Sequence, residues 1–139
     1  MTDTPTTSGP LVRSTVHGYP RMGPRRELKW VSESYWKGTA TAEEVDAVAA
    51  NLRAGALDQL RRAGVDDLPS NTFSHYDHVL DTAVLFDLVP ARLASPAGAD
   101  SREEQLRRYF ALARGEQGTP PLEMTKWFDT NYHHLVPEL

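Results

Sequence analysis

The hydrophobic residues in the first part of the chain recur at helical spacing. Residues 25–37 carry apolar side chains three and four positions apart, a period that places them on one face of a helix. These side chains are Leu28, Val31 and Tyr35. Pro24 stands where a helix could begin, and Gly38 is a residue type that closes one. The pattern therefore predicts a helix over residues 25–37.

A second helix is predicted after Thr41. Thr41 and Glu44 have the spacing of a capping box, in which each side chain accepts a hydrogen bond from the other residue's backbone N–H. Gly64 is a residue of the type that follows a helix end. The predicted buried stripe between these limits consists of Val45, Val48, Ala49, Leu52 and Ala56.

Two more helices are predicted further along. One begins near Ser74 or Asp77 and is stopped by Pro90, and its core face consists of Val79, Leu80, Ala83 and Val84. The other is capped by Ser101 and Glu104 and ends near Gly115. Its inward side chains are Leu106, Phe110 and Ala113. Residues 94–100, rich in Ala, Pro and Gly, are predicted to form the loop between these helices.

Strand candidates alternate with these helices. They are residues 11–16, 65–68 and 122–128, and residues 134–136 are a candidate continuation of the sheet after a turn. This order favours right-handed βα units with parallel strands. The predicted fold class is therefore α/β, a partial (β/α)8-barrel-like unit of about three βα repeats, since a whole barrel takes about 250 residues. The two open edges of such a sheet predict a homo-oligomer or a partner chain, with a piece of a longer reading frame as an equal alternative.

Composition narrows the class of protein. The chain has 139 residues and a net charge of -4, which gives no general attraction to nucleic acid or to anionic membranes. It has no cysteine, so disulfides, thiolate catalysis and cysteine-bound zinc are excluded within it. No apolar run has the length of a membrane span. Residues 1–12 are interpreted as a disordered tail, residues 13–139 as one domain, and the expected location is the cytoplasm.

Four cations gather within nine residues near the amino terminus. They are Arg21, Arg25, Arg26 and Lys29. Such a cluster suits a ligand with several carboxylates, because arginine binds a carboxylate through two hydrogen bonds and lysine adds a mobile charge. A solvated charged face is the alternative, and for four scattered cations it is the more common one.

Three segments resemble one known family in the family's order. They are residues 18–29 (GYPRMGPRRELK), 69–82 (PSNTFSHYDHVLDT) and 123–133 (EMTKWFDTNYH). Together they resemble the amino-terminal domain of cobalamin-independent methionine synthase, a zinc enzyme that transfers a methyl group from folate to homocysteine. The likeness extends from about residue 17 to the end of the sequence.

This resemblance implies a folate-binding role. It assigns folate contacts to Arg26, Glu27, Leu28, Lys29, Lys126 and Asn131, with 5-methyltetrahydrofolate polyglutamate as the ligand. It also implies that zinc, homocysteine and the chemistry belong to a second barrel whose metal ligands include cysteines. This chain is therefore expected to contain no metal or cofactor of its own, and to work with a separate catalytic chain rather than as an enzyme alone.

Two other functions remain open at this point. Asp77 and His78 are candidates for an acid–base pair, and a repurposed enzyme of specialised metabolism could use them at a homodimer interface. Its pocket would also hold Glu123, Lys126 and His133. His75 and His78 are three residues apart, but no metal site is predicted from them. The remaining alternative is a fragment that binds another protein and no small molecule.

Overall fold

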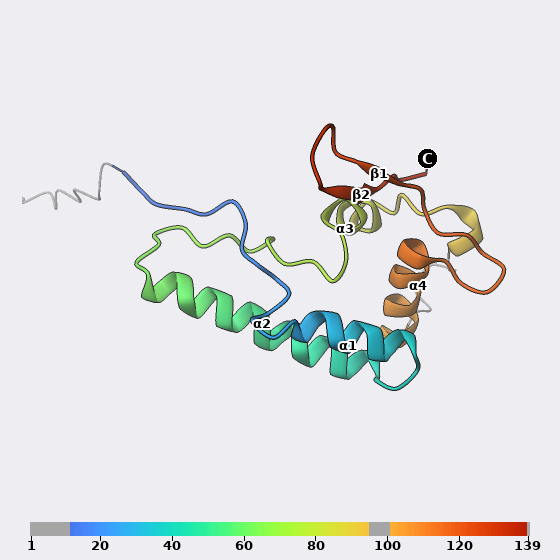
Figure 1. Ribbon diagram of the computed structural model, residues 1–139, viewed down its shortest axis with the longest axis horizontal. Coiled ribbons are helices and arrows are strands. Elements are labelled where there is room, and N and C mark those ends of the chain that lie inside the picture. Colours follow the sequence, from blue (N-terminus) through green and yellow to red (C-terminus); the bar gives the residue numbers. More distant parts are fainter. Residues whose placement is uncertain (1–11, 95–100, 139) are drawn as a thin grey trace, which may run out of the picture.

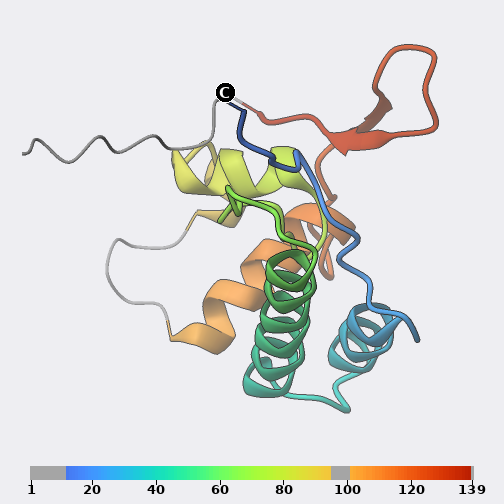
Figure 2. The same ribbon diagram turned by 90° about the vertical axis from the view of Figure 1, so that its left-hand side faces the viewer.

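The computed structural model describes residues 12–94 and 101–138. In chain order its elements are α1 (Glu27–Trp36), α2 (Ala42–Arg62), α3 (His78–Leu85), the short 3-10 helix η1 (Ala91–Leu93), α4 (Arg102–Arg114), β1 (Met124–Lys126) and β2 (His133–Leu135). Figure 1 shows α1 and α2 side by side at one edge of the molecule and the β1–β2 pair at the opposite edge. Helix α4 lies between them and packs against both α2 and α3, as Figure 2 shows from another side. No helix within the described ranges has the length and apolar character needed to cross a membrane.

The first two helices follow the sequence pattern closely. Helix α1 starts at Glu27 rather than at Pro24, because residues 22–26 form a tight turn with Arg26 in the left-handed region at φ 62°. Gly38, at φ 72°, ends it as predicted. The capping box of α2 is confirmed, with Glu44 N–H donating to the Thr41 hydroxyl over 3.3 Å and Thr41 N–H donating to the Glu44 carboxylate over 2.8 Å.

Helix α3 is shorter than its pattern indicated. Asp77, not Ser74, is its capping residue, and the helix ends at Leu85 before Pro90 is reached. The end is set by Asp87, whose positive φ of 56° turns the chain so that Leu88 N–H bonds back to the Ala83 carbonyl. Val84 is exposed, contrary to the prediction that it packs in the core, because the face of α3 that is buried carries Leu80 and Ala83.

Helix α4 joins two hydrophobic clusters. Its predicted cap at Ser101 and its end at Gly115 are both confirmed. One cluster contains Leu80, Leu93, Ala111, Leu112, Ala113, Leu122 and Leu135, and the other contains Ala42, Val45, Leu106 and Phe110. Since α4 supplies residues to both, it connects the α1–α2 pair to the half of the molecule that carries the strands. Each buried leucine adds about 1.5–3 kcal/mol through loss of contact with water.

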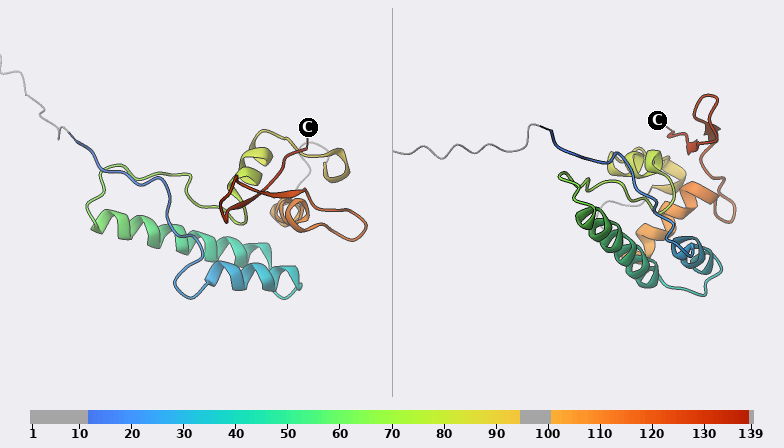
Figure 3. Two further views of the ribbon diagram at one scale, coloured as in Figure 1. Left: turned by 45° about the horizontal axis from the view of Figure 1, so that its top comes forward. Right: turned by 60° about the vertical axis from the view of Figure 1, so that its left-hand side comes forward.

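The strand segments pair in two different ways. β1 and β2 are antiparallel, with Lys126 opposite His133, because the short connection at 127–132 reverses the chain while a parallel crossover needs a dozen or more residues. The candidates at 11–16 and 65–68 do meet in parallel, through a single bridge between Thr15 and Asp67. Figure 3 shows that amino-terminal segment running beside the chain that follows α2. The parallel, barrel-like unit stays a prediction, and the predicted tail and loop lie almost wholly outside the described residues.

Candidate functional site: a basic cleft along α1

A cleft of about 500 Å³ runs along one face of α1. We call it the basic cleft. Its lining residues come from the turn before α1, from α1 itself, from the segment before α3 and from the end of α4. They are Arg21, Met22, Arg26, Leu28, Lys29, Ser32, Glu33, Trp36, His75, Tyr76 and Arg114.

The charges in the basic cleft are strongly unbalanced. Four cationic side chains, Arg21, Arg26, Lys29 and Arg114, line it together with one carboxylate, Glu33. Lys29 Nζ lies 2.7 Å from the Glu33 carboxylate, and this hydrogen bond holds the pKa of Glu33 below its usual value. The excess of positive charge makes the cleft attractive to an anion with more than one negative group.

The α1 side chains of the cleft share one helix face. Lys29, Ser32 and Trp36 follow one another at spacings of three and four residues, which aligns them along the axis, and Arg26 directly precedes the helix as its N-cap residue. Arg21 closes the side wall, donating to the backbone carbonyl of Tyr76 and, over 3.5 Å, to that of His75.

Three polar atoms on this lining are buried without a hydrogen-bond partner among the described residues. They are Ser32 Oγ, Trp36 Nε1 and His75 Nδ1. Burial lowers the pKa of His75, so the ring is favoured in its neutral form. Buried polar groups are nearly always paired in folded proteins, so these three atoms are exceptions, and they lie beneath the surface of the cleft wall and not on it.

The four consecutive residues predicted to contact folate, Arg26 to Lys29, have different positions in the structure. Arg26 and Lys29 line the basic cleft with their charges. Glu27 instead folds back onto the turn, accepting from Arg25 N–H at 3.0 Å and packing against Gly23. Leu28 has no exposed surface and anchors α1 from beneath the cleft.

Lys126 and Asn131 lie on the β1–β2 hairpin and not on the lining of the basic cleft. Both are exposed. The hairpin is held by Tyr132, whose hydroxyl donates to Asp77 Oδ1 over 2.8 Å. Burial and this bond raise the pKa of Tyr132 to about 12, and the positive charge of Arg21 opposes the rise. Arg21 therefore links the cleft electrostatically to the hairpin.

The Asp77 and His78 side chains face different surroundings. Asp77 is buried, and its carboxylate accepts hydrogen bonds from Leu80 N–H, Leu135 N–H and the Tyr132 hydroxyl. His78 is exposed and its Nδ1 lies 3.8 Å from Asp81. The geometry gives Asp77 the role of a helix cap and a tie to the hairpin. Across the described ranges no three His, Asp or Glu side chains gather as a metal site.

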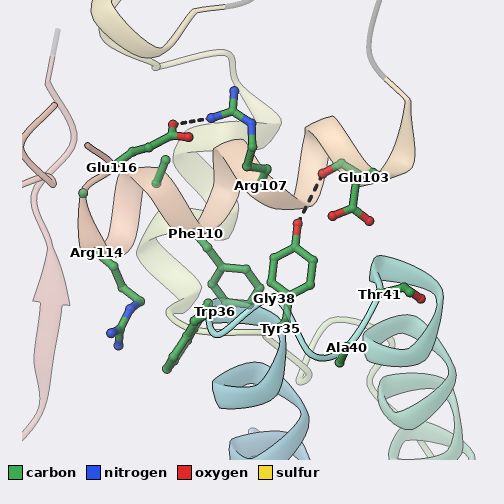
Figure 4. Close-up of a pocket in the computed structure, with 12 residues that line it drawn as sticks. Tyr35, Trp36, Gly38, Ala40, Thr41, Glu103, Arg107, Phe110, Arg114 and Glu116 are labelled. Atoms are coloured by element: carbon green, nitrogen blue, oxygen red, sulfur yellow. Dashed lines mark hydrogen bonds and ion pairs between the residues drawn. The ribbon is translucent and has the colours of Figure 1, made fainter. Parts of the chain in front are cut away.

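A second cleft, of about 680 Å³, adjoins the first where α1 meets α4 (Figure 4). Tyr35, Trp36 and Phe110 form an aromatic group there, with the Phe110 ring centre 5.6 Å from that of Tyr35 and 5.4 Å from that of Trp36. Arg107 forms ion pairs with Glu104 and Glu116. Because these charges are already neutralised, the second cleft is less suited to an anion than the basic cleft.

Trp36 and Arg114 belong to both clefts. The Arg114 guanidinium lies over the Trp36 indole, 3.8 Å from its centre. Arg114, Ser32 and His75 belong to no binding site that was predicted from the sequence. Of these three, only Ser32 could have been placed near Lys29 from the sequence, because it lies three residues further along the same predicted helix. Arg114 reaches the cleft through tertiary packing of α4.

The basic cleft and the helices that line it define a domain with a surface that attracts anions. Comparison with known proteins identifies the family. Residues 13–139 match the family described as cobalamin-independent synthase, N-terminal domain, and the chain belongs to that family. The resemblance found in the three sequence segments is thereby confirmed.

The relatives are much longer proteins. The 5-methyltetrahydropteroyltriglutamate–homocysteine methyltransferase of Streptomyces coelicolor is 55% identical over 127 residues, which cover 91% of this chain and 16% of that protein. The Streptomyces griseus protein of the same name is 56% identical with the same coverage. The 5-methyltetrahydropteroyltriglutamate–homocysteine methyltransferase 2 of Arabidopsis thaliana is 52% identical over 126 residues, which again cover 91% of this chain and 16% of that protein. The chain thus spans about 16% of the length of these curated relatives.

Proposed function

We propose that this chain is a folate-polyglutamate-binding module of the methionine synthase type. The observation that carries the proposal is the gathering of Arg26 and Lys29 with Arg21 and Arg114 in one cleft that contains a single carboxylate. A polyglutamate tail presents several carboxylates in a row, and arginine and lysine are the side chains that bind carboxylates most strongly. The names of the relatives, which contain a pteroyltriglutamate, support the same ligand.

The hairpin supplies the second half of the proposed site. Lys126 adds another cation and Asn131 an amide, and both are exposed to an incoming ligand. Trp127 and Tyr132 are also substantially exposed, and although His134 stacks on the Tyr132 ring at 6.3 Å, part of this aromatic surface is open to the folate ring. The tail would lie along α1 and the ring would approach the hairpin, with Arg21 between them.

Catalysis is proposed to need a second chain or domain. Methyl transfer to a thiol requires a thiolate, which a metal generates at neutral pH, and the sequence contains no cysteine ligand for zinc. Large apolar side chains are exposed on the surface, where a second chain or domain could contact them. Phe128 on the hairpin is 80% exposed, and Leu85 at the end of α3 is 78% exposed.

Calorimetric titration with 5-methyltetrahydropteroyl-triglutamate tests the ligand. The wild-type chain should bind it, binding should weaken between low and moderate salt, and Lys29→Ala should reduce the affinity about tenfold. A folded wild-type chain that gives no binding heat and no shift in melting temperature would overturn the proposal.

A further inference from the structure

One aromatic side chain is exposed at the tip of the β1–β2 hairpin. Phe128 is 80% exposed, more than any other aromatic side chain in residues 12–94 and 101–138. Its backbone has a positive φ of 48°, a region that bulky residues rarely occupy. Figure 2 shows the hairpin projecting from the body of the molecule. Strained backbone at an exposed aromatic residue indicates a functional surface.

The hairpin holds the Phe128 ring in a fixed position. Thr130 N–H donates to the Trp127 carbonyl over 3.2 Å, which closes the turn around Phe128. The Phe128 ring packs edge to face with that of Trp127, with 5.3 Å between the ring centres. The bond from Tyr132 to Asp77 ties the hairpin to α3. Because the ring is already ordered, it loses little conformational freedom when it binds another surface.

A small apolar groove of about 150 Å³ lies along the second half of α2. We call it the apolar groove. A cavity of this volume with apolar walls accommodates one ring of the size of benzene. Several of its side chains are only half-buried, so the groove is open at the surface. The apolar side chains that define it are Leu52, Ala56, Leu57 and Leu60 of α2, with Pro69 and Phe73 before α3.

The charges of the groove and of the hairpin tip are complementary. Arg21 and Arg53 line the apolar groove, and no carboxylate is among the residues that line it. The Arg53 guanidinium lies 5.2 Å from the centre of the Phe73 ring and forms no ion pair in the part of the chain that the structure describes. Asp129 directly follows Phe128 and is exposed, and its carboxylate likewise has no partner among the described residues. The tip thus presents a ring beside a carboxylate, and the groove presents apolar space beside a guanidinium.

We propose that the hairpin tip of one copy of this chain docks in the apolar groove of a second copy. Phe128 enters the groove and Asp129 pairs with Arg53. Phe128 does not fill the groove of its own chain, because it is exposed and α2 lies at the opposite edge of the molecule (Figure 1). Each copy has one tip and one groove, so the contact is head-to-tail. It needs no ligand and does not depend on the proposed folate function.

The expected association is weak. One aromatic anchor covers much less surface than a standard interface, so the dissociation constant should be on the order of 10⁻⁵ to 10⁻⁴ M. Sedimentation velocity at about 5 to 500 µM protein covers this range. The average mass of the wild type should rise with concentration.

Three substitutions locate the contact. Phe128→Ser removes the anchor and should weaken self-association about tenfold or more. Ala56→Phe fills the groove with a ring of its own chain and should have the same effect. Phe86→Ser is the matched control, because Phe86 is 69% exposed at the end of α3 and is also followed by an aspartate. This control should associate like the wild type.

Mixing and charge exchange test the pairing itself. Phe128→Ser keeps its groove and Ala56→Phe keeps its tip, so a mixture of the two should associate although neither does so alone. Arg53→Asp and Asp129→Arg should each weaken self-association about tenfold, because each places like charges together. The double variant restores opposite charges and should recover most of the loss.

The outcomes decide the proposal. A folded wild type that stays monomeric at about 500 µM overturns it. Self-association that persists in folded Phe128→Ser and Ala56→Phe overturns the docking of the tip in the groove. A loss in Phe86→Ser equal to that in Phe128→Ser overturns the specific role of the hairpin. If Ala56→Phe does not fold, the charge exchange decides, and a double variant no better than Arg53→Asp alone overturns the pairing.

Discussion

The Tyr132 hydroxyl donates a 2.8 Å hydrogen bond to Oδ1 of Asp77, and this contact joins the β1–β2 hairpin to the first turn of α3. The second oxygen of the same carboxylate accepts from Leu80 N–H at 3.0 Å, which caps α3, and from Leu135 N–H at 3.3 Å, which holds β2. One buried side chain thus positions the hairpin that carries Lys126 and Asn131. The low exposure of Asp77 follows from this shared use of its two oxygens.

Removing this carboxylate should destabilise the fold more than removing its tyrosine partner. Asp77→Ala loses the cap and leaves buried donors unpaired, so its free energy of unfolding should fall by about 2–4 kcal/mol. Tyr132→Phe removes one hydrogen bond and should lower it by about 0.5–1.5 kcal/mol. Urea denaturation followed by circular dichroism measures both. Thr82→Ala, an exposed α3 position, is the control, and equal losses in the Asp77 and Tyr132 variants would contradict the shared role.

The sequence predicted the helices well where local chemistry fixes their ends. Helices begin or end at the capping residues that the sequence indicated, because capping depends on neighbours in the chain. These residues are Thr41 with Glu44, Ser101, Gly38 and Gly115. The end of α3 was misjudged because Asp87 took up a left-handed conformation that no periodicity shows. The pairing direction of β1 and β2 depends on the connection between them, which the strand pattern alone does not reveal.

The candidate site was predictable only in its local part. Arg26 and Lys29 are three residues apart in the sequence, and the structure places both on the basic cleft, Arg26 just before α1 and Lys29 within it. Arg114 and His75 come from distant segments, and tertiary packing alone brings them there. Leu28, also in the predicted folate run, is fully buried, and its role as a folate contact stays a prediction.

His75 should make stability depend on pH in the weakly acidic range. Burial, and to a lesser degree the positive charge of Arg102, lower its pKa below 6.5, while Asp46 and Asp81 oppose this. The unfolded chain therefore binds more protons than the folded one at this site, and the free energy of unfolding should fall as the pH drops below about 6.5.

Denaturation at pH 7.5 and pH 5.5 checks this dependence. His75→Gln should reduce the loss of stability between the two conditions, because the buried titrating ring is gone. His17→Gln changes an exposed histidine and should retain the wild-type loss. A His75→Gln chain with an undiminished pH dependence would show that other groups cause it.

Gly115 should tolerate alanine far less well than Gly38. Both have positive φ, 78° and 72° respectively, so a side chain at either position strains the backbone by about 1–2 kcal/mol. At Gly115 a Cβ would also meet Pro121 Cδ at 2.9 Å and the Thr119 carbonyl at 3.0 Å, whereas the space around Gly38 is open. Gly115→Ala should therefore lower the melting temperature clearly more than Gly38→Ala, measured by differential scanning calorimetry. Similar shifts for the two variants would mean that the residues 119–121 move aside.

Removing the one carboxylate of the basic cleft should strengthen binding of the anionic ligand. Glu33 pairs with Lys29 at 2.7 Å and is the one carboxylate among the residues that line the cleft. In Glu33→Gln, Lys29 is released and the repulsion is gone, so affinity for the triglutamate should rise about three- to tenfold, the effect of roughly 1 kcal/mol near a protein surface. The gain should shrink in moderate salt, because added ions screen the repulsion that the substitution removes.

Glu43→Gln is the control for this prediction, because it changes the net charge equally on the exposed first turn of α2 and should leave affinity unaltered. Weaker binding in a folded Glu33→Gln chain would instead show that the ion pair holds Lys29 in its binding position, and that this ordering outweighs the repulsion.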